Sequence, residues 1–151
     1  MRGGNCLASI NSKMKMISAR NKMKGEVINV NKGAVNGIVK VKFGSNTVSA
    51  TISLEAIKEL GITEGKQVTA IAKATDVMVG VGELKGISAR NIFKGEVVKI
   101  NEGAVNSIVN IKVEDTLFSA TISKEAAEEL KLTEGKEASV IIKATSVMIM
   151  A

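Results

Sequence analysis

The chain has 151 residues and a formal net charge of +6, with no His, Trp, Tyr or Pro and a single Cys. The lack of histidine removes the usual proton shuttle at neutral pH and most histidine-based zinc sites. No apolar run reaches the ~20 residues that a membrane span needs, and we expect no export signal. Because a cysteine-poor chain of this kind is typical of the reducing cytoplasm, we expect a cytoplasmic protein that does not enter a membrane.

The chain repeats itself. Residues 17–79 and 87–149 align without a gap, and 36 of the 63 paired positions are identical. This predicts two copies of one small domain, joined by a linker at 80–86. Residues 1–16 have no counterpart in the second copy, and we interpret them as a flexible leader or as coding upstream of a natural start at Met14 or Met16. Domains this small bury a limited fraction of their surface, so we expect them to pack on each other or on other chains.

The first copy opens with two strand-like segments. Residues 24–30 and 35–43 contain alternating apolar residues, and the Asn-Lys-Gly sequence at 31–33 supplies the turn between them. A second turn at 44–46 precedes a β-branched segment, 47–52, which predicts a third strand.

A short helix follows the third predicted strand. Ser53 is placed as its N-cap, and the helix is expected from Leu54 to about Leu60. Two more strands are expected at 67–72 and 77–79. The fold class is therefore mainly β: two tandem five-stranded barrels of the oligonucleotide/oligosaccharide-binding type, each with one short α-helix. An open five-stranded sheet is the alternative.

The positive charge is uneven along the chain. The leader carries +3, the first copy +4 and the second copy −1. A nucleic-acid binder usually keeps a sustained basic face. Here particular basic positions survive in both copies, Arg20 with Arg90 and Lys73 with Lys143, and this pattern favours a few local anion contacts. Simple drift of surface charge is the alternative explanation.

Catalysis finds little support in the sequence. Four glutamates are kept in both copies: Glu26 lies in a predicted strand, Glu55 and Glu59 on an amphipathic helix that ordinarily faces solvent, and Glu64 in a turn. Without histidine there is no Ser-His or Cys-His pair, and no phosphate-binding glycine loop is present. We expect a protein that is not an enzyme.

Binding of a small oxyanion is better supported. Ser18 and Arg20 share a face if their segment is extended. Ser53 stands at a helix start, where free amides favour an anion, and Lys73 follows an apolar strand. Each also has a plain structural role: Ser53 as a cap of its own helix, Lys73 as a solvated strand end, and Arg20 in a surface ion pair.

These residues belong to motifs that resemble those of a known family. The segments ISARN, SATIS, TEGK and KAT, spaced around a short helix, resemble the Mop domain of the molbindins, which are molybdate-binding proteins. Both copies are covered nearly end to end, as in tandem molbindins. The resemblance implies the barrel expected above, no catalysis, and homotrimers of tandem chains. It also implies that molybdate or tungstate is held at interfaces between domains for intracellular storage, and it leaves a molybdenum-pterin ligand open.

The resemblance also implies a set of site residues. Hydroxyl and cationic side chains of the motifs, with neighbouring backbone or hydroxyl donors, would contact the oxyanion. They are Ser18, Ala19, Arg20, Ser53, Lys73, Ala74 and Thr75, and in the second copy Ser88, Ala89, Arg90, Ser123, Lys143, Ala144 and Thr145. One difference stands beside the lysine motif, because Asp76 in the first copy becomes Ser146 in the second. We expect the two classes of site to differ in affinity.

Two other functions stay open. One is a nucleic-acid-binding barrel, although single-strand binders generally use aromatic side chains on the sheet and this chain has only three Phe. The other is a ligand-sensing module docked on a protein partner.

Overall fold

The computed structural model describes residues 21–151. The leader at 1–16 and the predicted site residues Ser18, Ala19 and Arg20 lie outside the described residues. Within them, no helix is both long enough and apolar enough to cross a membrane.

The two copies fold with the same order of elements. In the first copy these are β1 (Asn21–Lys32), β2 (Asn36–Phe43), β3 (Asn46–Ser53), α2 (Leu54–Glu59), β4 (Gln67–Ala72), the 3₁₀ turn η1 (Ala74–Asp76) and β5 (Met78–Gly80). In the second they are β6 (Asn91–Glu102), β7 (Asn106–Val113), β8 (Thr116–Ser123), α3 (Lys124–Glu129), β9 (Glu137–Ile142), η2 (Ala144–Ser146) and β10 (Met148–Met150). The predicted β-β-β-α-β-β order is confirmed in both copies, and β1 is longer than the predicted 24–30 at both ends.

Alternation of side chains explains the strands. Along β2, Val39, Val41 and Phe43 are buried, whereas Lys40 and Lys42 are exposed. This is the period of two expected for a sheet with one face on a core. The prediction that these residues divide between two faces is therefore confirmed.

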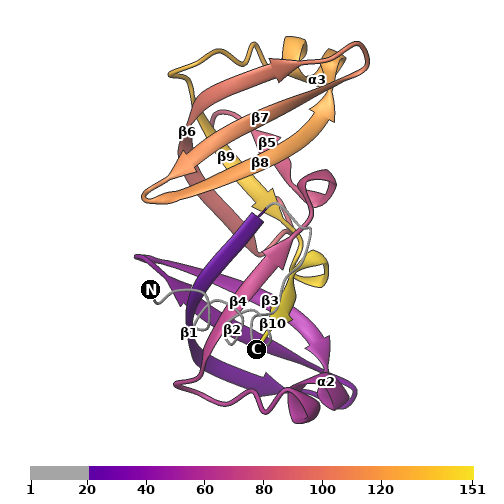
Figure 1. Cartoon of the computed structure of the whole chain (residues 1–151). Coiled ribbons are helices and arrows are strands. Elements are labelled where there is room, and N and C mark those ends of the chain that lie inside the picture. Colours follow the sequence, from indigo (N-terminus) through magenta and orange to yellow (C-terminus); the bar gives the residue numbers. More distant parts are fainter. Residues whose placement is uncertain (1–20) are drawn as a thin grey trace, which may run out of the picture.

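The sheets are completed across the two copies. One sheet has the order β10-β4-β1-β2-β3 and the other β5-β9-β6-β7-β8, so each copy gives its last strand to the other copy's sheet (Figure 1). Met148 to Met150 pair with β4, and Met78 to Gly80 pair with β9. The repeat predicts that each copy keeps its own fifth strand. The structure corrects that assignment, while the mainly β fold of two five-stranded units stands.

Each sheet curls strongly. Its order is linear, with β3 and β10 as the two ends of one sheet, yet these end strands come into contact as the sheet bends round. Glycine permits part of this bend. A Cβ on Gly25 would lie 2.0 Å from the carbonyl oxygen of Lys42, and a Cβ on Gly95 would lie 2.5 Å from that of Lys112. Only a residue without a side chain allows the strands to approach this closely.

Aromatic packing joins the two halves. Phe43 of the first copy meets Phe93 of the second edge to face, with ring centroids 5.2 Å apart, and Phe118 lies 5.9 Å from Phe93. All three rings are buried. Because the rings of both copies pack together, the halves share one core, which agrees with the expectation that domains this small pack on each other.

Candidate oxyanion site

The strand exchange makes two crossover turns between the sheets. The chain leaves β4 through Lys73 and η1 to reach the other sheet, and it leaves β9 through Lys143 and η2 to return. The turn η2 packs against β3 of the first copy, and η1 packs against β8 of the second. Each Lys-Ala-Thr motif therefore lies at the junction of the two halves.

Strand pairing brings the Ser-Ala-Arg-Asn motif to the same junction. Asn91, the first residue of β6, pairs with Ile142, the last residue of β9. Arg90 and Lys143 are the neighbours of this pair along the chain, so the two motifs of the second copy meet side by side. In the first copy Asn21 pairs with Ala72 in the same way, which places Lys73 beside the start of β1.

A pocket of about 420 Å³ opens where these motifs meet β3. Thr51 comes from the first copy, as does Met78 of the exchanged strand β5, and the other lining residues come from the second copy. They are Ile87, Ser88, Ala89, Arg90, Lys143, Ala144 and Thr145. Six of the seven site residues predicted for the second copy are thus brought together in one pocket.

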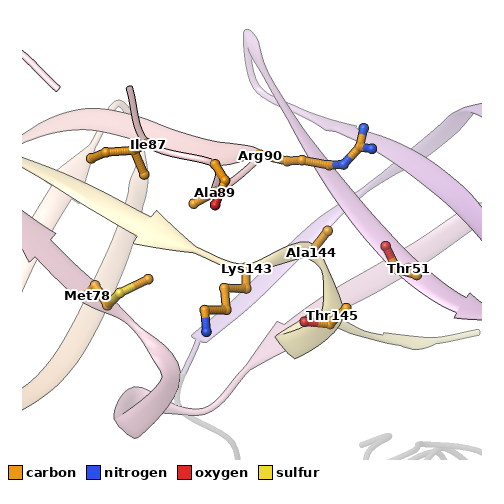
Figure 2. Close-up of a pocket in the computed structure, with 9 residues that line it drawn as sticks. Thr51, Met78, Ile87, Ala89, Arg90, Lys143, Ala144 and Thr145 are labelled. Carbon is orange, nitrogen blue, oxygen red and sulfur yellow. The ribbon is translucent and has the colours of Figure 1, made fainter. Parts of the chain in front are cut away.

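The pocket is open and polar at its rim. Ser88, Arg90, Lys143 and Thr145 are exposed, whereas Ala144 is buried. Figure 2 shows the side chains of Lys143, beside the turn, and of Arg90, before β6, extending in different directions, with Arg90 reaching toward the strands of the first copy. Within the single chain the two cations therefore do not converge on one point. A helical turn also leaves its first amides without a partner inside the turn, so η2 presents N–H groups beside these cations.

The two predicted helix-start serines do not line this pocket. The Ser53 Oγ accepts a hydrogen bond from the N–H of Ala56 at 3.1 Å, and the Ser123 Oγ accepts one from Ala126 at 3.0 Å. Both serines cap their helices, which is the plain structural role left open by the sequence. The hydroxyl of the SATIS segment that does line the pocket is that of Thr51, two residues earlier.

Sequence reasoning missed Thr51, Met78 and Ile87. Thr51 carried a signal, because SATIS is identical in both copies and its alternate residues share one face of a strand. Met78 carried none, since it reaches the pocket only through strand exchange. By the repeat, Thr121 and Met148 are the corresponding residues near Lys73, Ala74 and Thr75, where η1 packs on β8.

Comparison with known proteins decides the family. The sequence profile of the TOBE domain matches residues 17–79 and 87–149. The chain belongs to the TOBE-domain family. The resemblance to the molbindin group within it is confirmed by relatives of both one-domain and two-domain length.

Among these relatives, a probable molybdenum-pterin-binding protein of Haemophilus influenzae is 53% identical over 66 residues, which cover 43% of this chain and 96% of that protein. The molybdenum transport protein ModE of Herbaspirillum seropedicae is 31% identical over 95% of this chain and 55% of its own length. The solved structure of the cytoplasmic molybdate-binding protein ModG, with molybdate bound, is 38% identical. It superposes with a TM-score of 0.87 over 91% of this chain and 99% of ModG.

Proposed function

We propose that this TOBE-family chain binds molybdate and serves as an intracellular store or buffer of molybdenum, without catalysing a reaction. The observation that carries the proposal is the pocket at the junction, where a hydroxyl of one half faces the Lys-Ala-Thr turn and the Ser-Ala-Arg segment of the other. Hydroxyls, amides and a few cations suit a small tetrahedral dianion, whose surface consists of hydrogen-bond acceptors.

The proposed site residues fall into two groups related by the repeat. The second-copy group is Ser88, Ala89, Arg90, Lys143, Ala144 and Thr145 with Thr51. The first-copy group is Ser18, Ala19, Arg20, Lys73, Ala74 and Thr75 with Thr121. Ser53 and Ser123 act as helix caps in this proposal.

The open form of the pocket supports assembly into a larger oligomer. Lys143 and Arg90 diverge in the single chain (Figure 2), so a further chain against this surface would complete the coordination of an anion. We propose a homotrimer located in the cytoplasm. Similarity to ModG, which is described as cytoplasmic and was solved with molybdate bound, supports both the ligand and the compartment.

The affinity follows from a small number of contacts. Charge-assisted hydrogen bonds contribute about 1.5–3 kcal/mol each. Several around one dianion, less the cost of removing its water, reach about −8 kcal/mol, which corresponds to a micromolar dissociation constant. Tungstate has nearly the same size and charge and is expected to compete, whereas the smaller sulfate is expected to bind less well.

Nucleic acid is the weaker candidate. Stacking of single-stranded bases requires accessible aromatic rings, and Phe43, Phe93 and Phe118 are all buried in the shared core. No observation favours this function over oxyanion binding.

The test is a calorimetric titration of the full chain with molybdate, alone and in excess sulfate, with the oligomer mass measured by light scattering. Lys73→Ala with Lys143→Ala should remove most of the binding while the oligomer persists. The matched control is Lys42→Ala with Lys112→Ala, which removes two exposed lysines that are also kept in both copies. Unchanged stoichiometry in the first double variant would overturn the site, and no retained molybdenum in the wild type would overturn the function.

A further inference from the structure

The two copies differ at a pair of facing positions far from the junction. In the first copy Gly37 on β2 faces Ile57 on α2. In the second copy the corresponding residues are Ser107 on β7 and Ala127 on α3. The helices lie at opposite ends of the molecule, away from the crossover turns (Figure 1). A difference here therefore concerns a separate part of the surface from the oxyanion pocket.

In the first copy this space is filled. A Cβ on Gly37 would lie 2.6 Å from the Cδ1 of Ile57 and 3.6 Å from the Cδ2 of Leu54. Ile57 is buried and anchors α2 to the sheet. The glycine is required because the isoleucine side chain occupies the place of its missing Cβ.

In the second copy the same space is hollow. Ala127 lacks the bulk of Ile57, Lys124 replaces Leu54, and none of the residues of α3 is buried. A pocket of about 470 Å³ lies between α3 and the ends of β6 and β7. Its aliphatic lining residues are Ile100, Ala127 and Leu132.

A buried hydroxyl lines this pocket without a partner. Ser107 is fully buried, and its Oγ makes no hydrogen bond with any of the residues that the structure describes. Buried polar side chains are nearly always paired, because an unpaired one loses its bonds to water and gains nothing in return. The Ser107 Oγ keeps an unused bonding capacity, and the side chains that cover it must part slightly for a molecule in the pocket to reach it.

The charges at the rim nearly balance. Three acidic residues, Glu102, Glu128 and Glu134, stand with two basic ones, Lys124 and Lys131. Such a rim selects strongly for neither a cation nor an anion. The aliphatic lining residues and the Ser107 hydroxyl favour a neutral molecule with an apolar body and one oxygen.

We infer that the second copy holds a separate binding site for a small uncharged molecule with a branched aliphatic body and one hydroxyl or carbonyl oxygen. The body lies against Ile100, Ala127 and Leu132, where the first copy keeps its own isoleucine. The oxygen bonds the Ser107 Oγ. The site does not depend on oxyanion binding, since it shares no residue with the junction pocket.

The probe is 3-methylbutan-1-ol, followed through the amide NMR signals of residues 127–134 in the full chain. Wild-type protein should give saturable shifts in the millimolar range. The matched variant is Ser107→Gly with Ala127→Ile, which recreates the pair already packed in the first copy. It should weaken binding by about tenfold or more, because even one methylene of misfit in an apolar pocket has an effect of that order.

Two further variants keep the test decisive. Ala127→Val fills only part of the space and serves if the double variant does not fold, as judged by circular dichroism. Ser107→Ala should weaken the alcohol while leaving binding of isopentane-sized hydrocarbon unchanged. Shifts that grow without saturating, or that are equal in wild type and filled variant, would overturn the inference. So would a wild-type protein that shows no shift, because the pocket would then hold only water.

Discussion

The side-chain oxygen and nitrogen of Asn91 both form hydrogen bonds with the backbone of Ser49, which lies in the other half of the molecule. Its Oδ1 accepts from the Ser49 N–H at 2.8 Å, and its Nδ2 donates to the Ser49 carbonyl oxygen at 2.9 Å. Asn21 makes the same pair of bonds to Ser119, at 2.6 and 2.9 Å. Both asparagines are 1% exposed. Asn91 thus fastens the segment that ends at Arg90 to the strand that carries Thr51, and Asn21 fastens the start of β1 to the strand that carries Thr121.

Removing this carboxamide should loosen the junction. Asn91→Ala leaves a buried N–H and a buried carbonyl of Ser49 unpaired, and we expect the free energy of unfolding to fall by about 2–4 kcal/mol. Molybdate affinity should fall with it, because Ser88 to Arg90 lose their attachment to β3. Urea unfolding and calorimetry measure the two effects. Asn31→Ala, at an exposed asparagine of β1, is the control, and an equal loss in both variants would contradict the role of Asn91.

Because β10 pairs with a strand of the other copy, its removal should affect residues that are far from it in sequence. Deleting residues 148–151 removes β10, which pairs with β4 of the first copy. We expect faster amide hydrogen exchange at Thr69, Ala70 and Ile71, about 80 residues away in sequence, because these residues lose their neighbouring strand. The strand β9, which is paired with β5, should keep its protection. Faster exchange in β9 with an unchanged β4 would show that the strands are not exchanged.

Glu114 links the two halves at the tips of their hairpins, and its ionisation makes the stability of the fold depend on pH. Its carboxylate accepts bonds from the Ser45 hydroxyl, from the Ser45 N–H at 3.1 Å and from the Asn46 Nδ2 at 3.2 Å. The bond from the Ser45 hydroxyl, then that from its N–H, lowers the pKa of Glu114 below its usual value. A lowered pKa in the folded state means that the contribution is complete above the ordinary glutamate pKa of about 4.3 and is lost as the pH falls below it.

Glu114→Gln should therefore flatten the acid limb of the stability curve. Melting temperatures between pH 7 and pH 3 should fall less steeply in the variant than in wild type. Glu129→Gln, at an exposed residue of α3, provides the comparison. If the melting temperatures of wild type and Glu114→Gln fall in parallel with pH, the hydrogen bonds of Glu114 do not contribute to the loss of stability in acid.

Lys131 adopts a backbone conformation that suits glycine. Its φ is +52°, and the corresponding Gly61 has a φ of +63°. Left-handed backbone costs a residue with a side chain about 1 kcal/mol relative to glycine. Lys131→Gly should raise the free energy of unfolding by about that amount, and Gly61→Lys should lower it similarly. Chemical denaturation checks both, and a destabilised Lys131→Gly would show that its side chain does more than tolerate the strain.

Lys131 and Gly61 occupy the same position of the repeat and differ in side chain. After the helix the first copy has Gly61 and the second has Lys131, a difference that by itself would indicate a turn without a need for glycine. The structure shows that both copies keep the same left-handed turn, so the geometry is retained and the lysine is strained. The difference between the copies thus shows that the turn tolerates a lysine, and the positive φ angle shows that the lysine destabilises the fold relative to glycine.

The sequence by itself determined the duplication, the order of strands and helix, the buried faces and the helix caps. These depend on local features: alternation with a period of two, turn residues, and serine before a helix. It also placed the lysine and arginine motifs that meet in the junction pocket, because both occur unchanged in the two copies.

Only the tertiary structure decided where the last strand of each copy goes. The strands at 78–80 and 148–150 have three residues each and begin at the Met of the same Val-Met pair, so either one fits either sheet. With so few residues, local preference does not separate the two pairings, and the path of the crossover turn settles the choice. The same crossing brings Met78 and Thr51 of the first copy against Lys143 of the second, which is why the pocket belongs to neither copy alone.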